Sequence, residues 1–545
     1  MKLISFVSLS LLLATSADAA WLVKQVRPEV GKAAEIVDVQ KVDRQVEGMQ
    51  VLRSTPRFIA EHEQPSKEIY EEILYSDDAA PRNVRHFSHT EDVALTGASE
   101  VRTLVEQGPK QNRINLTMVG DGYTLAEKDR FFADAARLKE DLFGGRTFSS
   151  YLPLFNVYAV FVESRQSGVT DGSDRRETAL GLYRSPPGSK RGIMPGNPLA
   201  INAAIKLAPA TDFSILIAND EYYGGLGGQY AITTRSTQSG SVVLRHELGH
   251  NFGDVGEEYD NGGVYSGANS SRTASVSWKH WVDSPQTRVI ESKLVSGEYV
   301  WQPLAGRPYV AKFDFPSPTP AGGYAFEVQL STVGWQTPED VHVYFDGQKV
   351  DLAGKFTYDR SFLSFVLPQS PAPGRHQLEV RENISDGDNM LAFAVIYAQP
   401  PGFNTTADEI GAFATFDSNG TKSYRPTHET CLMRDMTSVD FCSVDQENMW
   451  TRFLERVKLI DEATVSGTGT RTVSVKTPPL PGLELRWYKV DETTGQASEL
   501  TGLQNQSSWM ADAQTQGTYR VKASFRTKEV RKLTPAFDGQ KDIKL

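Results

Sequence analysis

The chain has 545 residues, enough for about three or four domains of the usual size of about 100–200 residues, each with a buried core. Its 57 basic and 68 acidic residues give a formal net charge of −11, and the basic residues form no cluster. This balance argues against nucleic acid or an anionic membrane surface as the partner, and it says little about a substrate.

The first residues of the chain predict a secretory signal peptide over residues 1–19. Lys2 precedes an apolar core from Leu3 to Ala14, and Ala17-Asp18-Ala19 supplies the small residues of a cleavage site. The alternative is an N-terminal anchor, but the apolar core is too short to span a membrane. No later run is long and apolar enough to do so. We therefore expect a secreted protein, extracellular or, in a Gram-negative host, periplasmic.

Residues 20–111 are polar and mixed in character. They contain short apolar or alternating stretches such as Ile73–Tyr75 and Val84–His86, and no convincing helix. We predict a small β-rich N-terminal module or pro-segment.

An α/β pattern begins at Ile114. A strand over Ile114–Val119 is followed by a helix over Glu127–Phe143, whose apolar residues recur at helical spacing, and then by strands over Phe155–Val162 and Phe213–Ala218. Strands that alternate with helices favour an α/β sandwich with a mainly parallel sheet.

Two later regions have short alternating runs separated by proline and glycine, which is typical of β-sandwiches. The first, between about Val300 and Gln399, is plausible as an immunoglobulin-like module. The second, from Arg471 to about Arg531, follows a helix expected over Glu447–Val465. The expected strands are Tyr324–Leu330, Val341–Phe345, Phe362–Leu367, His376–Val380 and Leu391–Tyr397 in the first region, and Val473–Lys476, Leu483–Val490 and Tyr519–Ala523 in the second.

The motif His246-Glu247-Leu248-Gly249-His250 carries the chemistry of the chain. On a helix, His246 and His250 lie on one face and can present two imidazole nitrogens to one metal ion. Imidazole suits Zn²⁺, and an open coordination position lets a zinc ion activate water. Glu247 is then the general base, and the implied reaction is metal-assisted hydrolysis with one catalytic Zn²⁺ as cofactor.

The residues around the motif support a helix. Ser239 or Ser241 can cap its start, Val242–Leu244 is apolar, and Gly253 can end it. The alternative is an amphipathic helix whose histidines are merely solvated.

Cys431 and Cys442 are the two cysteines of the chain. Their spacing excludes a CxxC zinc or redox motif. In an oxidising compartment such a pair can close a short loop, and we predict a disulfide between them. The alternative is two reduced, buried thiols.

Four separated blocks of the chain include the motif and stand in a characteristic order: Asn115–Thr124, Tyr222–Gly228, His246–Tyr259 and Tyr424–Cys442. They resemble the bacterial immunoglobulin A peptidase family of secreted zinc endopeptidases. The matching parts cover roughly Asn112–Val300 and Ala407–Ile460. The resemblance implies a metzincin-like α/β zinc-peptidase domain, in which an edge strand, here Gly224–Thr234, binds the substrate backbone. The alternative for these glycines is a plain flexible loop.

The resemblance also assigns roles to residues outside the motif. Met433 matches the methionine of the turn that lies beneath the metal site. The alternative is an ordinary buried methionine. Tyr259 or Tyr424 is a candidate for a hydrogen bond to the oxyanion.

The third zinc ligand departs from the metzincin pattern, because Gly256 stands where that pattern has a histidine. If the helix continued, Glu257 would lie about 16 Å from His246 along its axis, so the helix must break. Gly253 and Gly256 can supply permissive turns. Glu257 or Glu258 is then the ligand. We favour Glu257, with Glu258 bracing the loop.

These observations define a multidomain α/β plus β protein. The parts are a signal peptide (1–19), an N-terminal β-rich module (20–111), a catalytic domain in two pieces (112–300 and 401–465, the second with the methionine turn), an inserted β-sandwich (301–400) and a C-terminal β-sandwich (466–545).

The function predicted from the sequence is that of a secreted zinc metalloendopeptidase acting on protein or glycoprotein substrates. Its expected partners include no nucleic acid and no membrane, and glycan docking by the β-sandwiches is a further hypothesis. The alternative function is a surface-binding, adhesin-like protein whose β-sandwich modules act and whose peptidase domain is a scaffold. The intact motif counts against it.

Overall fold

The computed structural model describes the backbone of residues 20–27, 35–42, 58–63 and 69–76, and then residues 95 and 97–545 with short gaps at 186–190, 263–264, 284–285, 386, 388, 404–405 and 407–408. The predicted signal peptide and the stretch Val84–His86 lie outside the described residues. The chain divides into two compact units, Met1–Val93 and Ala94–Leu545. In the described part of the chain, no helix has the length and apolar character needed to cross a membrane.

The first unit contains one antiparallel sheet with the strand order β2-β1-β4-β3. Its strands are β1 (Ala20–Arg27), β2 (Glu35–Val42), β3 (Phe58–Glu63) and β4 (Ile69–Ser76).

A six-stranded sheet organises the beginning of the second unit, with the order β11-β12-β10-β6-β7-β5. Four inner strands run parallel, and the two edge strands are antiparallel to their neighbours. The strands are β5 (Ser99–Val105), β6 (Ile114–Asp121), β7 (Phe155–Val162), β10 (Phe213–Ala218), β11 (Gly225–Leu226) and β12 (Ala231–Thr234). The sequence predicts that β5 is part of the N-terminal module. In the structure β5 instead extends this sheet, because its backbone pairs with β7.

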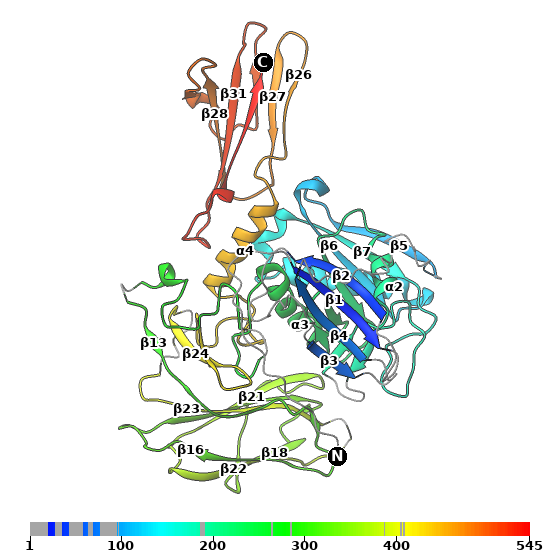
Figure 1. The fold of residues 1–545 in the computed structure, drawn as a ribbon, viewed down its shortest axis with the longest axis vertical. Helices are drawn as coiled ribbons and strands as arrows, with labels where there is room; N and C mark the ends of the chain where they lie inside the picture. The colour runs from blue at the N-terminus through cyan, green and yellow to red at the C-terminus, as the bar shows by residue number, and fades with distance from the viewer. Residues whose placement is uncertain are drawn as a thin grey trace. The chain divides into compact units, whose positions relative to one another are not determined.

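Helices cover both faces of this sheet (Figure 1). α1 (Lys128–Phe143) and α3 (Gly240–Leu248) pack on the face that presents Leu116 and Met118 of β6, and α2 (Pro198–Ile205) packs on the face that presents Val119. Every residue of β6 and β7 is buried, as expected for parallel strands covered on both sides. This part of the chain therefore has the mixed α/β character that the sequence predicts.

Residues 293–399 form two packed sheets with a core of their own. One sheet has the order β14-β23-β17-β21-β20, with β15 also on β23, and the other β16-β22-β18-β19. The strands are β14 (Lys293–Glu298), β15 (Gln302–Pro303), β16 (Tyr309–Phe315), β17 (Ala325–Val333), β18 (Val341–Phe345), β19 (Gln348–Val350), β20 (Ala353–Gly354), β21 (Arg360–Leu367), β22 (Gly374–Glu382) and β23 (Met390–Gln399). We call residues 293–399 the inserted module, since its first strand begins before residue 301.

Two small sheets of the described residues are separate from these larger ones. β8 (Tyr183–Ser185) pairs with β9 (Gly192–Met194), and β13 (Val289–Ile290) lies beside β24 (Ala412–Phe416), which pairs with β25 (Lys422–Arg425).

The last helix is shorter and starts earlier than predicted. α4 covers Ser443–Arg456, whereas a helix over Glu447–Val465 was expected. The alternating residues Glu462–Ser466 instead form strand β26, which pairs with β27.

Two sheets follow α4, with the orders β26-β27-β30 and β29-β28-β31-β32, coloured orange to red in Figure 1. Besides β26, the strands are β27 (Arg471–Lys476), β28 (Leu483–Val490), β29 (Ala497–Glu499), β30 (Ser508–Ala511), β31 (Thr518–Phe525) and β32 (Asp538–Lys544). Trp487 of β28 is fully buried, and the apolar residues of these sheets continue the core that contains α4.

Candidate active site

Helix α3 carries His246 and Glu247, and its end differs from the expected one. After Leu248 the backbone makes a π-helical turn over Gly249–Gly253, and Asp254 then takes a left-handed conformation with φ of 52°. The turn therefore uses an aspartate rather than Gly253 or Gly256, as aspartate tolerates this conformation better than most residues. The chain then folds back toward the two histidines.

Three side chains converge at this turn. Glu257 Oε2 lies 3.1 Å from His246 Nε2, and Glu257 Oε1 lies 3.3 Å from His250 Nε2. The three ligand atoms lie within 4.8 Å of one another. Although it is close to His246, the buried Oε2 atom has no hydrogen bond of acceptable geometry among the described residues. Two imidazole nitrogens and one carboxylate oxygen fit a zinc ion.

The other ring nitrogens of both histidines face backbone carbonyls. His246 Nδ1 lies 3.3 Å from the carbonyl oxygen of Leu432, and His250 Nδ1 lies 2.7 Å from that of Val255. A ring that donates from Nδ1 presents a lone pair at Nε2, which is the arrangement seen in histidines that bind metals. The backbone thus orients both rings toward Glu257.

The charges in this cluster depend on one another. Burial alone lowers the pKa of His250, but the hydrogen bond and charge of Glu257 outweigh it and raise that pKa to about 9. Burial likewise raises the pKa of Glu257, but His246 and His250 together lower it to about 2. The ionised carboxylate attracts positive charge, either as protons on the imidazoles or as a metal ion in their place.

Glu247 projects beside the cluster. Burial is the main reason that its pKa is raised, which favours a general base that works near neutral pH. Gly227 approaches it so closely that a Cβ atom there would lie 2.3 Å from Glu247 Oε2. Edge strand β11 immediately precedes Gly227, so this edge of the main sheet ends beside this carboxylate.

The inserted module contributes a residue that the sequence analysis missed. Asp359 is fully buried and accepts hydrogen bonds from the backbone N–H of Tyr223 at 2.5 Å, from Ser236 Oγ at 2.6 Å and from Ser239 Oγ at 2.5 Å. Ser239 occupies the N-cap position of α3, yet its hydroxyl does not cap the helix. Asp359 therefore joins the start of α3 to the segment before β11. No motif in the sequence marks this residue.

An aromatic cluster lies next to Asp359. The guanidinium of Arg360 lies 4.3 Å from the ring centroid of Tyr223 and 4.6 Å from that of Trp301, and the two rings stack at 5.6 Å. Tyr223 directly precedes Gly224, the first glycine of the block Tyr222–Gly228, so these contacts fix the approach to β11.

Met433 lies beneath the motif. A Cβ atom on Gly249 would lie 2.6 Å from Met433 Sδ, so the methionine packs directly against the helix end. Its carbonyl accepts a hydrogen bond from the N–H of Glu258 at 3.1 Å, and Met433 is fully buried.

Glu258 points away from the histidines. Its side chain lies with Cys431, Cys442 and Asp445, and the four ligand atoms lie within 4.8 Å of one another. The disulfide predicted between the two cysteines is wrong, because both are free, buried thiols. Burial raises the pKa of Cys442 to about 12, so the thiol keeps its proton.

The two tyrosines proposed for the oxyanion differ in position. The ring of Tyr259 lies 6.1 Å from that of His246, centroid to centroid. Burial is the largest cause of the raised pKa of Tyr259, and the charge of Glu257 raises it further. The hydroxyl of Tyr424 instead donates to Glu291 Oε1 at 3.0 Å. The structure thus brings Tyr259, and not Tyr424, to the histidines.

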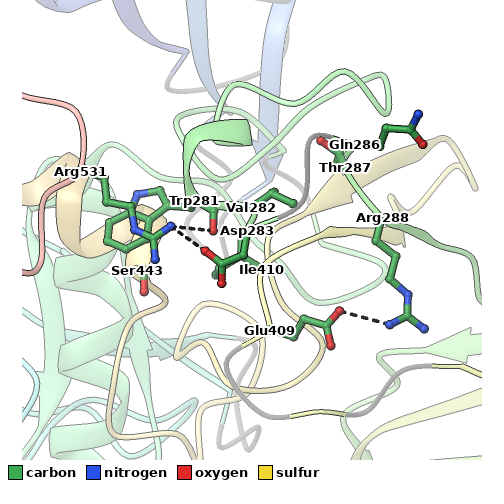
Figure 2. Close-up of a pocket in the computed structure, with 10 residues that line it drawn as sticks. All are labelled: Trp281, Val282, Asp283, Gln286, Thr287, Arg288, Glu409, Ile410, Ser443 and Arg531. Carbon is green, nitrogen blue, oxygen red and sulfur yellow. Dashed lines mark hydrogen bonds and ion pairs between the residues drawn. The ribbon is translucent and has the colours of Figure 1, made fainter.

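A pocket of about 720 Å³ lies elsewhere, lined by Trp281, Val282 and Ser443 among others. Figure 2 shows that its charged side chains are paired, Arg531 with Asp283 and Arg288 with Glu409. It contains no residue of the motif.

Comparison with known proteins adds a family match. Residues 103–285 match the model of the family described as IgA Peptidase M64. No curated protein matches the chain. Solved structures with some similarity include the FMN-binding β-glucuronidase from Facaelibacterium prausnitzii L2-6, at 12% identity over 44% of this chain and 32% of that one with a TM-score of 0.13. Another is a β-glucuronidase from Ruminococcus gnavus in complex with uronic deoxynojirimycin, at 10% identity over 44% and 35% with a TM-score of 0.11. The chain spans about a third of these structures, and at such TM-scores the likeness carries no argument.

Proposed function

We propose that the protein is a zinc-dependent endopeptidase with a metzincin-like catalytic domain. The match of residues 103–285 to the family described as IgA Peptidase M64 supports a peptidase. One observation carries this proposal. The Nε2 atoms of His246 and His250 face the carboxylate of Glu257, while Glu247 stands beside them.

We assign His246, His250 and Glu257 as the residues that would hold the zinc ion. A bound zinc ion supplies Lewis acidity, which polarises the scissile carbonyl and makes water more acidic. Glu247 takes the proton of the attacking water and passes it to the leaving amine. Its burial and raised pKa suit both steps.

Substrate binding is assigned to the sheet edge. An extended peptide that pairs with β11 would gain backbone hydrogen bonds and pass directly beside Glu247. Tyr259 is our candidate for the hydrogen bond to the developing oxyanion. Met433 is proposed as the methionine turn, because its side chain supports the end of the motif helix.

The test combines metal analysis with hydrolysis of casein. We expect purified protein to contain zinc, to lose hydrolysis when a chelator removes the metal, and to regain it when zinc is returned. A Glu257→Ala variant is expected to lose both catalytic zinc and hydrolysis. Full hydrolysis by metal-free protein would contradict the proposal. Folded, zinc-loaded protein that hydrolyses no peptide bond would favour the surface-binding alternative.

Secretion is a further part of the proposal and rests on the leader-like pattern of residues 1–19. N-terminal sequencing of exported protein is expected to begin near Ala20. An intact Met1 on exported protein would contradict a cleaved leader. The substrate class we propose is protein or glycoprotein, and the described residues give no support for separate glycan docking.

A further inference from the structure

We propose that Glu258, Cys431, Cys442 and Asp445 form a second, buried metal site that binds a structural zinc ion. We call these four residues the buried cluster. The inference does not depend on peptidase activity, since the cluster shares no side chain with His246, His250 or Glu257.

The geometry of the buried cluster is that of a preformed ligand set. Its four ligand atoms, one from each side chain, lie within 4.8 Å of one another. Cys431 Sγ lies 3.2 Å from Asp445 Oδ2, and Cys442 Sγ lies 4.0 Å from Glu258 Oε1. All four residues are at most 5% exposed.

Hydrogen bonding leaves this cluster incomplete. Asn269 Nδ2 donates to Glu258 Oε1 at 3.0 Å, and each thiol can donate only one hydrogen bond. Glu258 Oε2 and Asp445 Oδ1 have no hydrogen-bond partner among the described residues, although both are fully buried. A buried polar atom without a partner is unfavourable by about 1–3 kcal/mol or more, and a cation bound by this cluster would satisfy both atoms.

The donor set selects the kind of ion. Two sulfur and two oxygen atoms give the four ligands of a structural zinc site, and thiolates disfavour hard ions such as Mg²⁺ and Ca²⁺. When zinc binds, each thiol and each protonated carboxyl group of the buried cluster releases its proton to solvent, and the thiolates and carboxylates take the coordination positions, with no change of oxidation state. Full burial leaves no open position for a substrate, so the site is structural.

The buried cluster lies where a bound metal ion would hold segments of the active-site region together. Glu258 comes directly after Glu257, Cys431 lies two residues before Met433, and Cys442 and Asp445 lie at the start of α4. One ion would thus join three segments beneath the motif helix. Because Glu258 is the chain neighbour of Glu257, holding Glu258 also restricts the positions that Glu257 can take beside the histidines.

The experiment measures metal content and cobalt spectra of the full chain, expressed with zinc and then exchanged with Co²⁺. Wild type is expected to hold about two zinc ions per chain, and His246→Ala/His250→Ala about one. In both, cobalt is expected to show a thiolate-to-metal charge-transfer band. Cys431→Ser/Cys442→Ser is expected to lose that band. Two zinc ions retained by the histidine variant alongside an intact thiolate band would count against the catalytic site only.

Two results would overturn the buried site. One is a Cys431–Cys442 disulfide found by mass spectrometry of a nonreduced digest, and the other is the absence of a thiolate band in both wild type and the histidine variant. Both proteins keep the two cysteines, so the decision does not require the cysteine variant to fold. Asp445→Asn is a milder second variant, in which the band is expected to persist while the affinity for zinc falls at least tenfold.

Discussion

Replacing Asp359 with asparagine tests whether the inserted module supports the active site. Its carboxylate accepts three hydrogen bonds, from the N–H of Tyr223 and from the hydroxyls of Ser236 and Ser239. Asparagine keeps one acceptor oxygen and presents an NH₂ group in place of the other. The two serine hydroxyls can rotate to accept from that NH₂ group. The three hydrogen bonds can therefore persist, but they no longer involve a charged carboxylate.

The expected loss follows from the strength of these bonds. A hydrogen bond to a charged group contributes about 1.5–3 kcal/mol and a neutral one about 0.5–1.5 kcal/mol, a difference of about 1 kcal/mol for each bond. Three bonds therefore predict a loss of about 3 kcal/mol in the free energy of unfolding.

A matched control is available in the same module. Asp340 is also buried and accepts three hydrogen bonds, from the N–H groups of Gln336 and Thr337 and from the hydroxyl of Thr337. Asp340→Asn is expected to lose a similar free energy without touching the catalytic region.

Urea denaturation gives the stability of both variants, and peptide hydrolysis gives KM and kcat under conditions where both remain folded. Asp359→Asn is expected to raise KM several-fold, because the segment before β11 loses its support, whereas Asp340→Asn is expected to leave KM unchanged. Equal KM values for the two variants and wild type would refute the supporting role of Asp359.

Three other predictions concern Glu247 and Gly249 of the motif helix and the distant residue His428. Glu247→Gln is expected to retain zinc yet lose about 10²–10⁴-fold in kcat, because an amide cannot take a proton from water; hydrolysis within about tenfold of wild type would argue against its role as base. Gly249→Ala places a Cβ atom 2.6 Å from Met433 Sδ and is expected to lower the free energy of unfolding by about 1–3 kcal/mol, measured by urea denaturation; an unchanged midpoint would show that the methionine can move aside. Burial lowers the pKa of His428 from 6.5 to about 4, so the unfolded chain binds the proton first and stability is expected to fall by about 3 kcal/mol as the pH drops from 6.5 to 4. His428→Gln is expected to reduce this pH dependence, and an unchanged slope would contradict the assignment.

Much of the α/β region could be predicted from sequence patterns. Strands β7 and β10 have the predicted bounds, and α1 begins one residue later than predicted, because long apolar runs and helical spacing dominate these segments. Glu257, which the sequence favours over Glu258 as the zinc ligand, lies beside both histidines, and its role as a ligand stays a prediction.

Other features depend on contacts between distant segments and leave no local signal. Asp359 lies more than a hundred residues from the motif, and the pairing of β5 with β7 is a backbone interaction. The turn after His250 uses Asp254 rather than a glycine. The cysteines predicted to form a disulfide are free thiols, and each faces a buried carboxylate whose position cannot be predicted from the cysteine spacing.

Anomalous X-ray diffraction at the zinc absorption edge, on crystals of the full chain, tests the central claim most directly. The account predicts a peak within about 2.0–2.2 Å of His246 Nε2, His250 Nε2 and a carboxylate oxygen of Glu257. Crystals equilibrated with zinc that show no peak between these three side chains, in protein that still hydrolyses peptides, would contradict it.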